Sequence, residues 1–280
     1  MNEIHLKFVD DLTIGEAIRM KEMLNYKPVD VRPQPDTFHA RTGHSLEPEK
    51  SKVFNQLMKI KEYANSNGMK INFKKTKFIL FNPGTSRDFV PEFEMDDYDI
   101  ETVDEVRLLG LVVRNDLSWS SNTASMVERC NKKLWFLRRL KKLGATPYDL
   151  NDLYHKHILS ILEYATPVWH PALTNEDRLK LERIQKSALH IILGDGYRSY
   201  SSALKMTGNL TLFERRRKLC LQFAKKCIKN EKFKSWFKPS EKESITRQKM
   251  PKYKEAYCRL ERFKKSPIAY LTKLLNNETR

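Results

Sequence analysis

The sequence predicts an α+β fold in which a small partial sheet with helices is followed by an all-helical bundle. Alternating apolar and polar residues near the N-terminus are typical of strands, and apolar residues at helical spacing dominate residues 116–230. With 280 residues, of which 40% are hydrophobic, the chain can bury a sizeable core. We therefore expect one unit at 1–115, a helical unit at 116–230 and a partly disordered basic tail at 231–280.

The first unit begins with a strand pattern. Residues 4–9 alternate apolar and polar side chains and end at Asp10 and Asp11, so we expect a short hairpin with acids at its turn. A short helix is expected at 15–24, and a Pro-rich insertion occupies 25–48.

The rest of the first unit continues with one helix and two strands. Apolar positions keep helical spacing over 49–64, and Gly68 supplies a stop. Strands are expected at 78–81 and 106–113.

Residues after 115 have a purely helical pattern. The expected amphipathic helices lie at 120–143, 147–164, 174–194 and 212–228. Thr146 before Pro147 has the residue types of a helix N-terminus. In the first of these helices, one apolar stripe consists of Met126, Cys130, Leu134 and Leu137. We interpret Trp119, Trp135, Tyr164 and Trp169 as core residues.

The net charge of +17 is unevenly distributed. Residues 88–105 hold nine acids and no Lys or Arg, whereas 125–143 carry seven basic residues and one acid, and 214–265 carry nineteen basic residues and six acids. Both basic segments interleave charges with aromatic residues, such as Trp135 and Phe136. This pattern favours nucleic acid as the partner over an acidic protein or a membrane surface.

Composition excludes several other classes of protein. Collagen, a disulfide scaffold and a fully disordered chain do not fit it. No apolar run reaches the roughly 18–20 residues of a membrane span, and we expect an intracellular protein, nuclear or cytoplasmic, without a membrane partner. The four cysteines lack C-x-x-C spacing and are interpreted as reduced thiols.

Adjacent carboxylates at a hairpin turn can hold a hard cation. Mg²⁺ prefers a few carboxylate oxygens, waters and substrate phosphates, and Asp10 with Asp11 fits that preference. An ordinary surface turn or a helix cap explains the pair equally well.

Several segments in one order resemble the reverse transcriptases of non-LTR retrotransposons, the LINE and jockey-like elements. Residues 8–11 (FVDD) resemble the F-x-D-D signature, and 68–77 (GMKINFKKTK) resemble G-x-x-(I/L)-N-x-x-K-T-K. Residues 108–119 are similar to the Y-L-G-V…L-S-W stretch of that family. Segments that look like the helices after the polymerase core lie at 137–140, 162–169, 181–186 and 214–217.

This resemblance implies a partial polymerase palm at 1–115 and a thumb-like helical domain at 116–230. Asp10 would be the main Mg²⁺ ligand and Asp11 the secondary one, in two-metal phosphoryl transfer on an RNA/DNA template-primer. Lys75 would lie near the triphosphate, where a cation neutralises developing charge. Leu109 and Gly110 would form the primer grip, with backbone close to the primer terminus.

The resemblance also marks the basic helices as the nucleic-acid-binding surface. The residues concerned are Arg129, Lys132, Lys133, Arg138, Arg139, Arg215, Arg216 and Arg217. In the family, the fingers and an earlier palm aspartate precede the F-x-D-D segment. We therefore expect a truncated RNA-directed DNA polymerase that is inactive alone.

Two alternatives need no catalysis. One is an RNA/DNA-binding helical module, and the other is a relic whose helices bind an unknown protein. Residues 116–170 also resemble a short segment at the N-terminus of AlkB-homologue tRNA-modifying enzymes. Oxygenase chemistry would require a His-x-Asp…His triad for iron, and no H-x-D occurs in the sequence.

Overall fold

The fold described here comes from a computed structural model that describes residues 4–7, 12–15, 52–81, 93–95, 98–240 and 252–278. The chain divides into two compact units, Met1–Leu117 and Ser118–Arg280. Described strands lie in the first unit and most of the described helices in the second, so the predicted α+β class is confirmed.

A hairpin opens the first unit. Strand β1 (Ile4–Lys7) pairs antiparallel with β2 (Leu12–Gly15), and Lys7 lies opposite Leu12. The strand pairing agrees with the predicted hairpin. Residues 8–11 between the strands lie outside the described residues, as do 16–51, which contain most of the predicted first helix and the Pro-rich insertion.

The predicted second helix is confirmed as α2 (Lys52–Ser66). A turn follows the helix at Gly68, whose φ of +66° lies in the left-handed region that glycine adopts without a side-chain clash. The amide of Met69 then donates to the carbonyl of Ala64 at 2.8 Å, which satisfies a carbonyl in the last turn. A short 3₁₀ turn, η2 (Phe73–Lys75), follows.

A three-stranded sheet has the order β3-β5-β4. Strand β3 (Lys77–Phe78) runs parallel to β5 (Tyr98–Thr102), and β4 (Phe93–Met95) runs antiparallel to β5. Strands β4 and β5 were not predicted from the sequence, because they lie in the acidic stretch. A cross-strand ion pair between Lys77 and Glu101 offsets part of that charge.

The single strand predicted at 106–113 is wrong. The segment forms a hairpin of β6 (Glu105–Leu108) and β7 (Leu111–Arg114), which reverses at Leu109 and Gly110. Both turn residues have positive φ, +48° and +82°, as a two-residue primed turn requires. Gly110 adopts this conformation freely, whereas it costs Leu109 about 1 kcal/mol.

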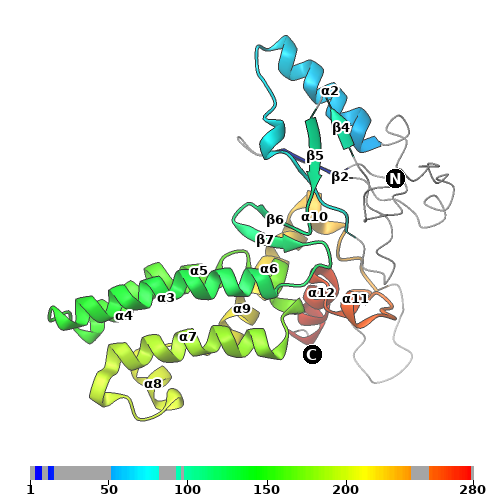
Figure 1. The fold of residues 1–280 in the computed structure, drawn as a ribbon. Coiled ribbons are helices and arrows are strands. Elements are labelled where there is room, and N and C mark those ends of the chain that lie inside the picture. The colour runs from blue at the N-terminus through cyan, green and yellow to red at the C-terminus, as the bar shows by residue number, and fades with distance from the viewer. Residues whose placement is uncertain are drawn as a thin grey trace, which may run out of the picture. The chain divides into compact units, whose positions relative to one another are not determined.

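Two long helices, α3 (Ser120–Lys142) and α7 (Asn175–Leu193), pack side by side in the second unit (Figure 1). The predicted stripe of α3 is buried, with Met126, Cys130, Leu134 and Leu137 at most 2% exposed. At the helix beginnings, the Ser120 hydroxyl donates to Asp177 Oδ2 at 3.0 Å, and the hydroxyl of Thr174, the N-cap of α7, donates to the same oxygen at 2.7 Å.

A third helical stretch spans the predicted 147–164 segment. Thr146 and Asp149 form a capping box at the start of α4 (Pro147–Leu153). A π-helical turn at Tyr154–Leu159 leads into α5 (Ser160–Glu163). The π turn has no signal in the apolar spacing, and it places Tyr154, Ile158 and Leu159 in the core.

Shorter elements complete the helical unit. They are α6 (Thr166–Trp169), η4 (His170–Ala172), η5 (Gly194–Gly196), α8 (Tyr200–Thr207), α9 (Leu212–Lys229), α10 (Glu231–Lys234), α11 (Glu261–Lys264) and α12 (Pro267–Glu278). Helix α9 confirms the last predicted helix, and Thr211 with Glu214 forms a capping box at its start.

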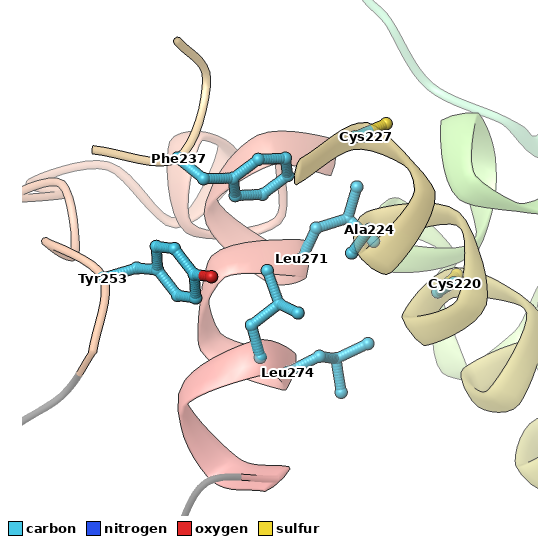
Figure 2. Packing of buried hydrophobic residues seen from close by; sticks show 8 residues of the cluster. Cys220, Ala224, Cys227, Phe237, Tyr253, Leu271 and Leu274 are labelled. Atoms are coloured by element: carbon cyan, nitrogen blue, oxygen red, sulfur yellow. The ribbon is translucent and has the colours of Figure 1, made fainter. Parts of the chain in front are cut away.

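The C-terminal helix corrects the interpretation of 231–280 as a tail. Leu271 and Leu274 of α12 point toward α9, where Cys220, Ala224 and Cys227 are buried (Figure 2). Phe237 and Tyr253 join the same cluster. Burial of these side chains supplies the free energy that holds the described C-terminal residues on the helical unit.

Candidate nucleic-acid interface

The face of α3 opposite the buried stripe carries two large aromatic side chains between cations. Trp135 is 61% exposed and Phe136 is 45% exposed. Because residues three and four apart are neighbours on a helix, Lys132 lies one turn before these rings and Arg139 one turn after them. The Arg139 guanidinium lies 5.8 Å from the centre of the Trp135 ring, in cation–π contact.

Helix α3 carries more positive charge than its neighbours neutralise. Its sequence contains seven basic residues and one acid, Glu128. Lys132 donates to Glu128 at 2.7 Å, and this hydrogen bond lowers the pKa of the carboxyl. The exposed side chains without a salt bridge to any described residue are Lys133, Arg138, Arg139 and Lys142. These four cations are available to an anionic partner.

Two basic residues of α3 face inward. Arg129 is half-buried and its Nε lies 3.4 Å from the carbonyl oxygen of Ser125 on the same helix. Lys141 donates to the carbonyl of Ile191 in the last turn of α7, where a cation also meets the negative end of the helix dipole. Lys141 therefore stabilises helix packing, and Arg129 is less accessible than the sequence analysis expected.

The three successive arginines of α9 point in three directions, since neighbouring helix residues are about 100° apart. Arg215 forms an ion pair with Glu163, whose side chain is 16% exposed. Arg216 is fully buried. Only Arg217 is exposed. The prediction that Arg216 contacts nucleic acid is therefore wrong for this structure, and Arg215 is already occupied by a carboxylate.

Arg216 has an unusual buried environment. Its Nε donates to Nδ1 of His170 at 3.3 Å, and its guanidinium lies 5.7 Å from the centre of the Trp169 ring. Burial lowers the pKa of Arg216 to about 10. Burial, with the charges of Arg216 and Arg178, lowers the pKa of His170 to about 3, so the imidazole is neutral. This cluster is part of the core and carries no surface for phosphate.

The remaining cations of α9 lie on its exposed surface. Lys225 donates to Glu278 of α12 at 2.6 Å. The exposed residues that make no salt bridge to a described residue are Arg217, Lys218, Lys226 and Lys229. Together with α3, this helix gives the second unit two basic surfaces.

The predicted catalytic residues of the first unit are only partly described. Asp10 and Asp11 lie outside the described residues. Lys75 is exposed at the end of η2, and its amide donates to the side chain of Asn72 at 3.2 Å. An open hollow of about 520 Å³ lies beside this turn, and Lys75 does not line it.

Three other lysines line this hollow together with asparagines. The lining includes Lys61 and Asn65 of α2 and Lys70, Asn72 and Lys74 of the segment that follows. Lys61 was not predicted as a site residue because it lies in the second half of an ordinary amphipathic helix. Its spacing in the sequence predicts a position on the polar face of α2. That spacing does not show that residues 70–74 line the same hollow.

The predicted primer-grip residues form the tip of the β6–β7 hairpin. Leu109 is 36% exposed and Gly110 has no side chain, so the turn presents backbone and one apolar side chain. This geometry permits close approach of a ligand to the backbone.

Two kinds of site, a group of metal-ligating side chains and a membrane-spanning helix, do not occur among the residues that the structure describes. No three His, Cys, Asp or Glu side chains there form a group that could hold a metal ion. No helix among those residues combines the length and hydropathy that a bilayer crossing requires. Comparison of the chain with protein-family models, curated proteins and solved structures returns no match.

Proposed function

We propose that the helical unit, Ser118–Arg280, binds RNA or DNA through the phosphate backbone, as the thumb-like part of a protein related to non-LTR reverse transcriptases. The observation that carries this proposal is the set of exposed cations on α3 and α9 that have no carboxylate partner among the described residues. Lys133, Arg139, Arg217 and Lys226 are examples from both helices. Like charges on one surface repel one another unless carboxylates pair with them. Since most of the charges on these helices are cations, an anionic partner would relieve that repulsion.

Salt dependence tests the proposal directly. Each phosphate that a cation neutralises releases counterions, so the logarithm of affinity falls linearly with the logarithm of salt concentration. For four contacts on a single strand the slope is about −2.8, which weakens binding roughly 50-fold between 50 and 200 mM salt. Fluorescence anisotropy with a labelled oligonucleotide measures this change. Affinity that is flat over this range would rule out the proposal.

The adjacent arginines of α9 supply a matched pair of variants. Arg217→Ala removes an exposed cation, so we expect weaker binding at 50 mM salt and a shallower salt slope, by about one contact. Arg216→Met replaces a buried side chain by an apolar one of similar length, and we expect unchanged binding. Equal losses in the two variants would show that folding, and not contact, governs the effect.

A second candidate function is Mg²⁺-dependent nucleotide transfer, for which we expect the chain to be inactive alone. This function is favoured by the antiparallel pairing of β1 with β2, which agrees with the hairpin that the sequence predicts. Primer extension with Mg²⁺ on the full chain tests it. Template-dependent incorporation that Asp10→Ala abolishes would establish this function, whereas oligonucleotide binding without incorporation would leave the binding function.

A further inference from the structure

We propose that the outward face of α3 is a stacking site for unpaired nucleobases, so that the protein prefers single-stranded nucleic acid to duplex. The site consists of the Trp135 and Phe136 rings with Lys132, Lys133 and Arg139 around them. This inference rests on the proposed function, because it assumes that α3 contacts nucleic acid, and it adds which form of nucleic acid is bound.

The two rings are not needed for the packing of α3. The seam between α3 and its neighbours is already filled by Met126, Cys130, Leu134 and Leu137 on the opposite face. Trp135 and Phe136 stay 61% and 45% exposed, and apolar surface that remains in water gains nothing from folding. Adjacent exposed aromatic rings of this size are a feature of binding surfaces.

The position of the charges matches a polyanion whose bases stack. Lys133 lies one turn before Phe136, and Arg139 lies one turn after both rings; neither forms a salt bridge to a described residue. Lys132, one turn before both rings, would exchange its bond to Glu128 for one to a phosphate. A nucleotide that stacks on a ring has phosphates on both sides, so cations on both sides of the rings can neutralise them. Arg139 already contacts the Trp135 ring at 5.8 Å, which holds a cation beside the stacking surface.

Other partners use this face less completely. In duplex nucleic acid the faces of the bases are covered by neighbouring base pairs, so the cations would find phosphates but the rings would find no base. An acidic protein segment supplies carboxylates without flat π faces. A membrane surface takes up aromatic and basic side chains, but its affinity scales with the inserted apolar area. Here the exposed large apolar side chains of α3 and its C-cap are only those two rings and Leu143, since the apolar stripe of α3 is buried.

Fluorescence of Trp135 reads out the stacking in the full chain. Trp119 and Trp169 are buried, and the remaining tryptophan, Trp236, is 41% exposed. In a Trp236→Phe background, Trp135 is therefore the only tryptophan that is open to solvent. We expect a single-stranded oligothymidylate or oligouridylate to quench it, and a blunt duplex of equal length to leave it unchanged.

Affinities of variants separate stacking from charge. Trp135→Ala should weaken single-strand binding at least roughly fivefold, and leave duplex affinity within about twofold, because one stacked base contributes that much or more. Trp135→Phe keeps a ring and should retain most of the affinity. Phe223→Ala on α9 removes another exposed ring, 39% exposed and outside the site, and should change neither affinity. Far-UV circular dichroism verifies that each variant is folded.

Three outcomes would overturn the inference. The first is an equal loss of affinity for single strand and duplex in Trp135→Ala, and the second is a single strand that binds without quenching Trp135. The third is a Trp135→Ala protein that no longer binds anionic phosphatidylserine vesicles but keeps its affinity for oligonucleotides. In the first two, salt-dependent binding itself persists, so the proposed function survives. If no oligonucleotide binds at 50 mM salt, the proposed function fails, and the stacking site fails with it.

Discussion

The hydrogen bond between Arg216 and His170 sets the tautomer of a buried imidazole. The arginine Nε is a donor only, so Nδ1 of His170 accepts and carries no proton. The ring proton is then on Nε2, which faces the Tyr270 hydroxyl at 3.4 Å. A second proton on His170 would break the bond to Arg216 and place two cations in contact.

This arrangement predicts a dependence of stability on pH. The pKa of His170 falls from 6.5 to about 3 on folding, so between these values the unfolded chain binds the proton and the folded chain does not. Stability is therefore present above pH 6.5 and is lost as the pH falls, by about 2 kcal/mol between pH 7 and pH 5. Urea unfolding at the two pH values measures the loss.

His170→Gln is the control for this prediction. Its amide oxygen can accept from Arg216 but does not titrate, so the free energy of unfolding should change less between pH 7 and pH 5 than in the unaltered protein. An equal pH dependence in both proteins would assign the effect to other carboxyl or imidazole groups.

Single residues show where sequence reasoning succeeds and where it fails. The buried stripe of α3 follows from spacing, and the same spacing places Trp135 off the stripe, although the residue type alone suggested core. Trp169 is fully buried and Trp135 is 61% exposed, so the helical register, not the residue type, decides. Three consecutive arginines look alike in sequence, but only the packed helix shows that Arg216 points inward.

At the level of elements, α12 is anchored by one polar side chain. Asn276 is 1% exposed. It accepts from the amide of Tyr253 at 3.0 Å and donates to the carbonyl of the same residue at 3.0 Å. The amide group therefore satisfies both buried backbone groups of a residue in the segment before α11.

Asn276→Ala should lower the free energy of unfolding of the protein by about 2 kcal/mol, because the backbone N–H and C=O of Tyr253 would be buried without partners. The neighbouring Asn277→Ala removes the same side chain from an exposed position, and should change stability by less than about 0.5 kcal/mol. Chemical unfolding monitored by circular dichroism compares the two. Similar losses would contradict a specific role of Asn276.

The elements that sequence reasoning missed depend on contacts that are distant in sequence or on unusual backbone. Helix α12 begins with Pro267 at its first position and has apolar residues at helical spacing, but a long basic segment before it suggested a tail. The β6–β7 turn places Leu109 at positive φ, a conformation that leucine rarely adopts. No local pattern of residue types predicts either the turn or the docking of α12 on α9.

At the scale of the whole molecule, the predicted division after residue 115 lies close to the observed one after Leu117. The change from alternating to helical apolar spacing marks it, because strands and helices bury their apolar residues with different periods. For the candidate site, the sequence predicted which helices form it and that they carry positive charge. Which of its residues are accessible is known only from the packed structure, in which Arg216 is buried, Arg215 is paired with Glu163 and Trp135 is exposed.

The reactivity of the four cysteine thiols measures whether the core of the helical unit is folded. Cys130 belongs to the buried stripe of α3, Cys220 and Cys227 are buried between α9 and α12, and Cys258 is half-buried. Burial raises the pKa of Cys130 and Cys220 to about 12 and also raises the pKa of Cys227. Since the thiolate is the reactive form, these three thiols should be protected in the folded state.

A thiol titration with an aromatic disulfide reagent is therefore expected to give one fast thiol, Cys258, in the native protein and four in denaturant. If α12 is an integral part of the unit, the three protected thiols should become reactive over the same range of urea concentration, because opening of the core is then cooperative. Single Cys→Ser variants assign each phase. Exposure of Cys220 and Cys227 at lower urea than Cys130 would show instead that α12 detaches before the α3–α7 core opens, as an independent unit of stability.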